Sequence, residues 1–302
     1  MERVVIEENI NERIDSYLSK NTEYSRSKIV KMLKDKSILV NDKEVKSSYV
    51  LKQGDNIYIG EYKEEEMSIE PEDIPLDIVY EDDDVIVVNK PNKMVVHPAI
   101  GNNHGTLVNA LLYHSKKLSD INGEFRPGIV HRIDADTTGL LMVAKNNKAH
   151  EILADELSKK ETTRKYIALV WGVIKEDTAT IDAPIGRDSN DRKKMAVTSL
   201  NSKDSITHLR VLKRFKDATL IELQLETGRT HQIRVHMNYI DHPVINDPVY
   251  GRRKLIDDSG QCLHAKTIGF IHPTKKEYME FSSELPECFT NILNIFEEEE
   301  KK

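Results

Sequence analysis

The chain has 302 residues and a net charge of −7, and its 38% hydrophobic and 31% charged residues are typical of a folded chain with one large and one smaller domain. The longest apolar runs, such as ALVWGVI at 168–174, are far shorter than the ~20 residues of a membrane-spanning helix. The acidic start MERVVIEENINERID argues against a secretory signal, and two cysteines are too few for a disulfide framework or a zinc site, so we expect a cytoplasmic protein with no membrane segment.

The negative charge is concentrated in two short segments. Residues 61–84 contain twelve acids and one lysine, and the tail EEEEKK at 297–302 contributes −2. The remainder at 85–296 is mildly basic, with a net charge of +5. Because local patches decide binding to polyanions, the overall charge does not exclude a nucleic-acid partner.

Residues 1–62 are predicted to form a small module. Apolar spacing indicates helices over INERIDSYLSK and SRSKIVKMLKDK, the second capped by Ser25, and the strands SILVN and NIYIG follow. Basic residues outnumber acids around the second helix, namely Lys20, Arg26, Lys28, Lys31, Lys34 and Lys36. Charge alone is equally consistent with a solvated helix face and with a nucleic-acid contact.

Residues 63–80 are predicted to be an acidic linker, because EYKEEEMSIEPEDIPLDIVY sustains neither a helical nor a strand period. Residues 81–296 are predicted to form the larger domain, and residues 297–302 an acidic tail.

The larger domain mixes strands and helices along the chain. Strands are predicted in DVIVVNKP, LLMVAK, KYIALVWGVI, SITHLRVLKRF and ATLIELQLE, and helices in GTLVNALLYH, NKAHEILADELSKK and HQIRVHMNYI. Successive strands without an intervening helix imply antiparallel pairing. We therefore expect an α+β fold with a large mixed, mainly antiparallel sheet, preceded by a small α+β module.

Several chemistries find no support in the sequence. Neither GxGxxG nor GxxxxGK[ST] occurs, and there is no CxxC. His231 and His236 are five residues apart, whereas two metal ligands on one helix face are four apart. We expect no metal site, and we favour hydrogen-bonded structural roles or phosphate contacts for these histidines.

Two acids, Asp134 and Asp136, lie one residue apart in HRIDADTTGLLMVAK. Paired carboxylates could flank a sugar, as in a glycosidase. The ADTTG stretch is more typical of a turn, in which Asp136 bonds to the backbone or to Thr138 and Gly139 permits a positive φ. Spacing therefore gives Asp136 a structural role and leaves the role of Asp134 open.

The same run resembles the HRLDxxTSGLLxxAK signature of the RluA-type (RluA/RluC/RluD) RNA pseudouridine synthases. Further segments resemble motifs of that family in the same order, namely NKPNKMVVHP, KYIALVWG, PIGR, ETGRTHQIRVHM, HPVINDPVYG and QCLHAKTIGFIHP. Together the matches cover roughly residues 80–290. Several motifs in order are far more specific than one.

The first module resembles the ribosomal S-four-type (S4) RNA-binding domain, whose pattern is R-x-D-x-x-L, then SR at a helix start, then V-x-V-N-G. The matching residues are Arg13, Asp15, Leu18, Ser25-Arg26 and LVN at 39–41. This resemblance favours RNA contact over plain solvation for the basic surface. The implied RNA-binding residues are Arg13, Arg26, Lys28, Lys31 and Lys34.

The chain departs from the family pattern at some glycine positions. Glycine is usual near 93, 241 and 246, where this sequence has Lys93, Asp241 and Asn246, and in the small module Asp42 replaces a glycine. These departures put the local backbone shape in question rather than the activity.

The resemblance also implies roles for individual residues. Asp134 is the implied catalytic aspartate, acting at ribose carbon 1 or taking a sugar proton, and no cofactor is implied. A cation must keep it ionised; Arg229 is our candidate, with Arg234 as the alternative. Active-site support is completed by a Tyr that can stack on uracil, an Arg that fills the gap left by the flipped base and an apolar wall, namely Tyr166, Arg132 and Leu263. Phosphate contacts are conceivable for Lys90 and Lys93.

We therefore expect an RNA pseudouridine synthase, monomeric by default, whose substrate is large-subunit ribosomal RNA. Transfer RNA is the alternative substrate. A non-catalytic ribosome-assembly factor that grips RNA with the same fold is the alternative function. A glycosidase acting on free nucleosides would give the basic surface of the first module no role.

Overall fold

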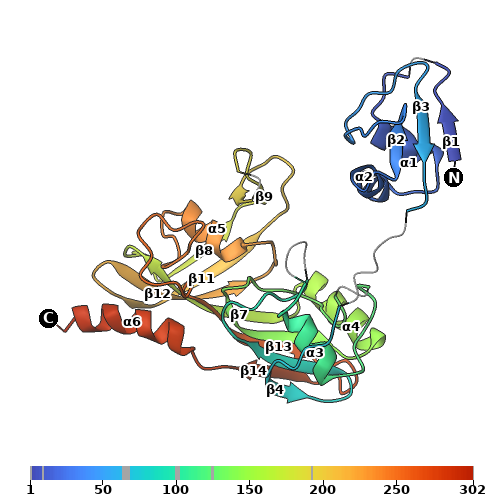
Figure 1. Ribbon diagram of the computed structural model, residues 1–302. Coiled ribbons are helices and arrows are strands. Elements are labelled where there is room, and N and C mark those ends of the chain that lie inside the picture. The colour runs from blue at the N-terminus through green and yellow to red at the C-terminus, as the bar shows by residue number, and fades with distance from the viewer. Residues whose placement is uncertain are drawn as a thin grey trace. The chain divides into compact units, whose positions relative to one another are not determined.

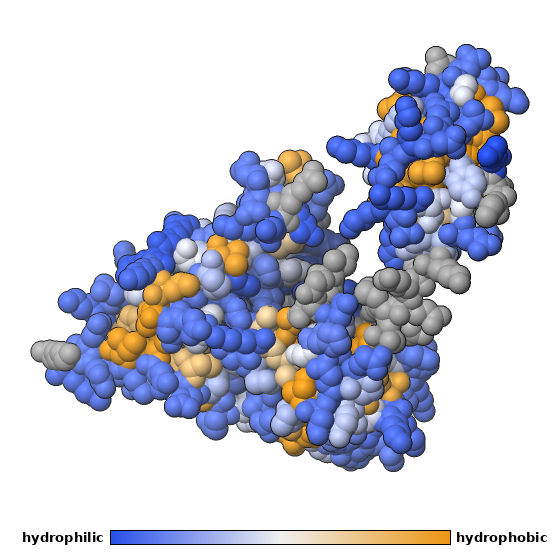
Figure 2. All heavy atoms as spheres, viewed as in Figure 1, coloured by the Kyte–Doolittle hydropathy of each residue, from blue (hydrophilic) through white to orange (hydrophobic). Residues whose placement is uncertain are grey.

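The computed structural model describes residues 2–8, 10–62, 69–98, 103–123, 126–191 and 193–301, and the chain divides into two compact units, Met1–Met67 and Ser68–Lys302 (Figure 1). The face shown in Figure 2 is mainly hydrophilic on both units, with smaller hydrophobic areas. Among the described residues, no helix is long and apolar enough to cross a membrane.

The N-terminal unit is a three-stranded antiparallel sheet with two helices. The sheet order is β1-β3-β2, and the elements are β1 (Glu2–Val5), α1 (Ile14–Asn21), α2 (Arg26–Lys34), β2 (Ile38–Val40) and β3 (Asn56–Ile59). Ser25 caps α2, as predicted, by accepting the backbone N–H of Lys28. The strand β1 was absent from the prediction, because MERVV is too short and too charged to show a strand period.

A buried acid holds the two helices of this unit together. Asp15 is 2% exposed, and it accepts hydrogen bonds from the guanidinium groups of Arg13 and Arg26 at 2.9 to 3.1 Å. Burial alone would raise the pKa of Asp15, but these two arginines lower it below its usual value. The R-x-D…SR pattern therefore has a structural reason within this unit.

The C-terminal unit is built on a nine-stranded sheet within the described residues. Its order is β4-β5-β6-β13-β7-β12-β11-β8, with β14 paired to β13. The strands are β4 (Asp77–Glu81), β5 (Val85–Lys90), β6 (Thr138–Ala144), β7 (Thr163–Trp171), β8 (Thr178–Asp182), β11 (Ile206–Arg214), β12 (Ala218–Leu225), β13 (Leu263–Ile271) and β14 (Tyr278–Ser282). A separate two-stranded sheet pairs β9 (Ile185–Arg187) with β10 (Met195–Val197). The mixed α+β class is confirmed.

One parallel pair interrupts the otherwise antiparallel sheet. β6 runs parallel to β13, with Thr138 opposite His264 and Gly139 opposite Ala265. Gly139 has a φ of +109°, and a Cβ there would overlap the backbone of Ala265, its carbonyl oxygen first. Only glycine therefore allows the two strands to approach at this point.

Four helices complete the described part of this unit, namely α3 (Leu107–His114), α4 (Asn147–Lys159), α5 (Gln232–Tyr239) and α6 (Glu287–Glu299). The central strands are buried on both faces: Val85 and Val87 of β5 share a cluster with Leu153 of α4, whereas Ile86 shares one with Leu107 of α3. Continuous burial explains why VIVV reads as an unbroken apolar run.

The linker and tail predictions were each too long. Of the predicted linker 63–80, residues 63–68 lie outside the described residues. The later part belongs to the C-terminal unit, because Ile74 and Leu76 pack on its core and β4 begins at Asp77. The acidic segment at 297–302 is not a separate tail over its described length, since α6 continues to Glu299. Charged residues on the exposed faces of β4 and α6 give these segments the composition of a linker and a tail.

The positions at which the family has glycine keep a left-handed backbone here. Lys93, Asp241 and Asn246 have φ values of +61°, +62° and +61°, and Asp42 has +59°. Asn246 carries the largest structural role, because its amide donates to the Gly260 carbonyl at 2.8 Å and accepts the Ile256 N–H at 2.8 Å. The expected backbone shape is thus retained, and the side chain additionally orders residues 256–260.

Candidate active site

Asp134 lies in the turn that leads into β6. The backbone N–H of Thr137 donates to its carbonyl oxygen at 3.1 Å, which closes the turn. Thr138 then joins β6 to β13 through a hydrogen bond of 2.8 Å between its hydroxyl and Nδ1 of His264. Thr138 therefore bonds to His264 instead of Asp136. The pairing of β6 with β13 therefore holds the turn that contains Asp134.

The cation beside Asp134 is Arg234, from α5. Its Nη1 donates to Oδ2 of Asp134 at 2.8 Å, and its Nε and Nη2 donate to the two oxygens of Asp247 at 2.7 and 2.9 Å. The Asp134 side chain is 17% exposed, whereas that of Asp247 is fully buried. Burial opposes the charge of Arg234, but the two carboxylates raise its pKa above its usual value. Arg234 is therefore a permanent cation at this site.

Our preference for Arg229 as the partner of Asp134 was wrong, and the alternative Arg234 takes that place. The Nε of Arg229 donates to the carbonyl oxygen of Asp204 at 3.0 Å, and its backbone N–H is held by the side chain of Gln232 at 2.9 Å. Neither contact involves the carboxylate of Asp134. Arg229 nevertheless lines the same pocket as Asp134.

The residues predicted to form the active site come together around one pocket. It is lined by Asp134, Arg132, Tyr166, Arg229, Leu263, Arg164, Ile233, Arg234 and neighbouring residues. Tyr166 on β7 and Leu263 on β13 are 7% and 5% exposed and lie on paired strands. Burial raises the pKa of the Tyr166 phenol, which stays neutral. An aromatic ring and an aliphatic side chain can enclose a planar base.

The buried ammonium of Lys90 binds the backbone of the loop that contains Asp134. Lys90 is 1% exposed, and its Nζ donates to the carbonyl oxygens of Ala135 at 2.7 Å and Pro91 at 2.8 Å. Burial lowers the pKa of Lys90 to about 7, against the opposing effect of Asp136 and Asp134. A phosphate contact by Lys90 is therefore wrong, because the group is enclosed by protein. Its partners are backbone carbonyls, which sequence cannot identify.

Histidine and glutamine side chains lock α5 in place. Gln232 accepts from the Thr227 hydroxyl at 2.8 Å and donates to the Ile206 carbonyl at 3.0 Å. His236 is fully buried, and its Nε2 lies 2.9 Å from the Ala183 carbonyl oxygen. The structural role favoured for His236 is confirmed. His231, by contrast, lines the pocket beside Asp134.

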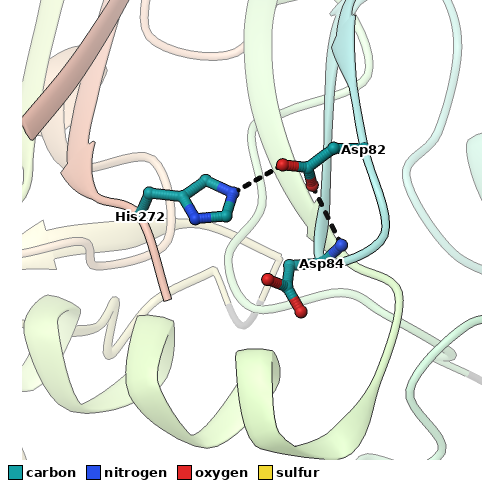
Figure 3. A group of neighbouring side chains, drawn as sticks. All are labelled: Asp82, Asp84 and His272. Atoms are coloured by element: carbon teal, nitrogen blue, oxygen red, sulfur yellow. Dashed lines mark hydrogen bonds and ion pairs between the residues drawn. The ribbon is translucent and has the colours of Figure 1, made fainter. Parts of the chain in front are cut away.

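A cluster of possible metal ligands lies elsewhere in this unit, as Figure 3 shows for Asp82, Asp84 and His272. Its ligand atoms already have partners. The Nε2 of His272 donates to Asp82 at 2.8 Å, its Nδ1 accepts the Lys275 N–H at 3.1 Å, and the Lys275 ammonium lies 3.2 Å from Asp82. The cluster therefore fastens the turn after β13 to the β4–β5 turn, with a lysine supplying the positive charge.

Comparisons with known proteins identify the family of the chain. A family model described as RNA pseudouridylate synthase matches residues 84–239, and an S4 domain model matches residues 12–57. The RNA pseudouridine synthase YlyB of Bacillus subtilis is 53% identical over 288 residues, which cover 95% of each chain. Ribosomal large subunit pseudouridine synthase D of Escherichia coli K12 is 40% identical over 306 residues, covering 96% of this chain and 92% of the relative. A solved structure, human RNA pseudouridylate synthase domain containing 1, is 26% identical with a TM-score of 0.58, and the match covers 78% of this chain and 98% of the human one.

The chain belongs to the RNA pseudouridylate synthase family, in its RluA-type branch that carries an N-terminal S4 domain. It is an RNA pseudouridine synthase, an isomerase that converts uridine to pseudouridine in RNA.

Proposed function

We propose that this enzyme modifies large-subunit ribosomal RNA and that Asp134 is its catalytic residue. The observation that carries the catalytic assignment is the geometry of the carboxylate. Arg234 donates to Oδ2 and places its positive charge beside the carboxylate, while Oδ1 is left without a close hydrogen-bond donor among the described residues. Attack on a sugar carbon, or removal of a sugar proton, requires a carboxylate oxygen with a lone pair that faces the substrate; because a carboxylate oxygen has two lone pairs, one further donor at Oδ1 would still leave one of them available.

The reaction breaks the bond from ribose carbon 1 to N1 of uracil and joins carbon 1 to carbon 5, with the proton of carbon 5 lost and a proton gained at N1. No electrons are exchanged and no group is imported, so we propose that no cofactor takes part. Asp134 would serve either as a nucleophile on carbon 1 or as a base at carbon 2. Both routes need the carboxylate in its ionised form.

The remaining pocket residues have distinct proposed tasks. Tyr166 and Leu263 enclose the detached uracil while it turns over, and Arg229 contacts the RNA beside it. Arg132 is exposed at the edge of the pocket, so its guanidinium can enter the helix where the flipped nucleotide was.

The ribosomal substrate is supported by the relatives. Proteins named ribosomal large subunit pseudouridine synthase D match more than nine-tenths of this chain and of their own length at 40% identity. The proposed RNA surface of the S4 unit includes Lys31 and Lys34, which are exposed on α2, and Lys28, which is half-buried over the Tyr24 ring at 4.9 Å. Arg13 and Arg26 keep about half of their side chains exposed while they hold Asp15.

The test is pseudouridine mapping in cells that lack the gene, with large-subunit RNA, small-subunit RNA and transfer RNA analysed separately. We expect one or more sites to disappear from large-subunit RNA, to return with the wild-type gene and not to return with Asp134→Asn. Sites missing only from transfer RNA would contradict the proposed substrate. A complete set of sites in large-subunit RNA would also contradict the proposed substrate, and restoration by Asp134→Asn would refute the catalytic assignment.

A further inference from the structure

The imidazole of His231, like the guanidinium of Arg234, lies beside the carboxylate of Asp134. Its Nε2 lies 3.8 Å from Oδ1, the oxygen that Arg234 leaves free. Its other ring nitrogen, Nδ1, lies 2.8 Å from the hydroxyl of Tyr250. The imidazole therefore stands between the reactive carboxylate and a phenol that belongs to the HPVINDPVYG segment.

The hydroxyl of Tyr250 favours a proton on Nε2 of His231. That hydroxyl accepts the backbone N–H of Met195 at 2.9 Å, so its own proton is available for Nδ1 of His231. A neutral histidine that accepts a hydrogen bond at Nδ1 has its proton on Nε2. The resulting Nε2–H faces Oδ1 of Asp134.

The groups around His231 form a rigid frame. Asp247 binds Arg234 with both oxygens and also accepts the backbone N–H of Tyr250 at 2.9 Å. The Arg234 guanidinium lies 5.1 Å from the centre of the Tyr250 ring. Asp247 therefore holds both Arg234, which donates to Oδ2 of Asp134, and Tyr250. The hydroxyl of Tyr250 in turn orients His231 toward Oδ1. The backbone at His231 is left-handed, with a φ of +57°, which places the imidazole at the start of α5.

We propose that His231 is a positioning residue: its neutral side chain presents Nε2–H to Oδ1 of Asp134 and, together with Arg234 on Oδ2, fixes the rotation of the carboxylate for attack on the sugar. The inference rests on the proposed catalytic role of Asp134. A separation of 3.8 Å is longer than a hydrogen bond, and such contacts in a substrate-free enzyme shorten when the substrate closes the site.

The neutral state of His231 is part of this role. Burial lowers the pKa of His231, and Arg234 and Arg132 act in the same direction, against the opposing effect of Asp134 and Asp247. The imidazole is therefore uncharged at neutral pH. Protonation in acid would place an imidazolium beside Oδ1 and withdraw the negative charge that the reaction uses. We expect this protonation to contribute to the loss of activity on the acid side.

The first experiment compares His231→Gln with His231→Asn. The amide nitrogen of glutamine reaches the place of Nε2, whereas that of asparagine reaches only the place of Nδ1. With in vitro transcribed large-subunit RNA containing uridine tritiated at carbon 5, and excess enzyme, the rate of tritium release measures the chemical step. We expect His231→Gln to stay within about threefold of wild type and His231→Asn to be slower on the order of 10- to 100-fold, because the donor is misplaced.

Backbone strain predicts the opposite order, which makes the comparison decisive. Asparagine adopts a left-handed backbone more readily than glutamine, so a purely structural role would favour His231→Asn. Equal rates, or a faster asparagine variant, would overturn the inference. Unfolding temperature and RNA affinity are measured on the same samples, and His208→Gln with His208→Asn, at a histidine on β11 that pairs with Glu226, serves as the matched control pair expected to leave the rate unchanged.

The pH profile supplies a readout that folding would not affect. In His231→Gln nothing at position 231 titrates, so we expect the acid-side fall in rate to move to lower pH than in wild type. Identical acid limbs would overturn the inference. Tyr250→Phe, which keeps the ring next to Arg234 and removes the hydroxyl, is expected to lower the rate with RNA affinity unchanged; an unchanged rate would overturn it as well. An active Asp134→Asn would refute the catalytic assignment itself, whereas an inactive one with equal His231 variants would refute only the role of His231.

Discussion

Arg234 and Asp134 share a single hydrogen bond of 2.8 Å, between Nη1 and Oδ2, although a guanidinium can bind a carboxylate with two. The second edge of the guanidinium is taken by Asp247 at 2.7 and 2.9 Å. Asp134 therefore receives a permanent neighbouring charge while one of its oxygens stays free. A pair with two hydrogen bonds would have placed the same charge beside the carboxylate but engaged both of its oxygens.

Replacing Arg234 and Arg229 with lysine, one at a time, separates the roles of the two pocket arginines. Arg234→Lys keeps a charge but cannot serve both acids, so we expect the single-turnover rate to fall about 10²-fold, because the carboxylate is no longer held in place. Arg229→Lys alters an arginine whose guanidinium bonds only to the Asp204 carbonyl among the described residues, so we expect weaker RNA binding with the rate at saturating RNA within a few-fold. Rate and affinity are measured on the same transcript. A larger loss of rate in Arg229→Lys would contradict this division.

The buried Lys90 should make stability depend on pH in the alkaline range. Its pKa is about 7 in the folded protein, against an ordinary value of ~10.4 in an unfolded chain. Between these values the unfolded state binds more protons, so the free energy of unfolding rises with pH by about 1.4 kcal/mol per unit; the destabilisation is complete below pH 7 and gone above the unfolded pKa. Urea unfolding from pH 7 to 10 measures this slope.

The matched pair for that measurement is Lys90→Met and Lys93→Met. Lys90→Met removes the buried titrating group and should abolish the rise, while it lowers activity because the Ala135 carbonyl loses its donor. Lys93 is exposed and pairs with Asp258, so Lys93→Met should retain the rise. A slope that persists in Lys90→Met would show that another group is responsible.

Two glycines with positive φ should respond very differently to alanine. Gly139→Ala drives a Cβ into the Ala265 carbonyl, so we expect a loss of more than about 3 kcal/mol in the free energy of unfolding, with activity lost as β6 and β13 separate. Gly105 has a φ of +68° with open space around its Cβ position, so Gly105→Ala should cost only about 1 kcal/mol of backbone strain. Thermal and urea unfolding compare the two, and equal losses would contradict the close approach of the strands.

The basic surface of α2 should determine how steeply RNA affinity falls with salt. Removing one phosphate contact reduces the slope of log affinity against log salt by about 0.7 to 0.9, so the triple variant Lys28→Gln, Lys31→Gln and Lys34→Gln should flatten it by up to about 2 to 3. The same change at Lys43, Lys46 and Lys52, which are exposed in the loops of the same unit, removes equal charge and should leave the slope nearly unchanged. Equal effects would mean that general charge, and not this helix, attracts the RNA.

Periodicity was sufficient for the elements that are buried or strongly amphipathic. The helix at Asn147–Lys159 and the strand at Val85–Lys90 lie where apolar spacing predicted them. It failed for β4, because DIVYE lies at the edge of the sheet with alternate residues exposed and the others only half-buried, between acids that dominate the local composition. Edge strands expose their polar side chains, so their sequences resemble loops.

The candidate site was predictable in its membership but not in its pairing. Resemblance brought Asp134, Tyr166, Arg229 and Leu263 to one pocket, and the structure places them there. Choosing Arg234 over Arg229 required the structure, because Arg229 lies before α5 and bonds to the Asp204 carbonyl, whereas Arg234 lies on α5 and bonds to the carboxylate. The supporting Asp247 and Tyr250 lie in HPVINDPVYG, so their segment was recognised although their partners were not.

The parallel contact between β6 and β13 has a consequence for the order in which the enzyme is made. Gly139 pairs with Ala265, so β6, which already has β5 as one neighbour, acquires its second neighbour β13 only after the chain has been synthesised well beyond Asp134. Such long-range pairings form slowly, and domains near the N-terminus generally fold first during synthesis. The S4 unit can therefore be folded on the ribosome while Asp134, the proposed catalytic residue, still lacks the residues that surround it. A nascent chain would acquire its RNA-binding surface before its chemistry.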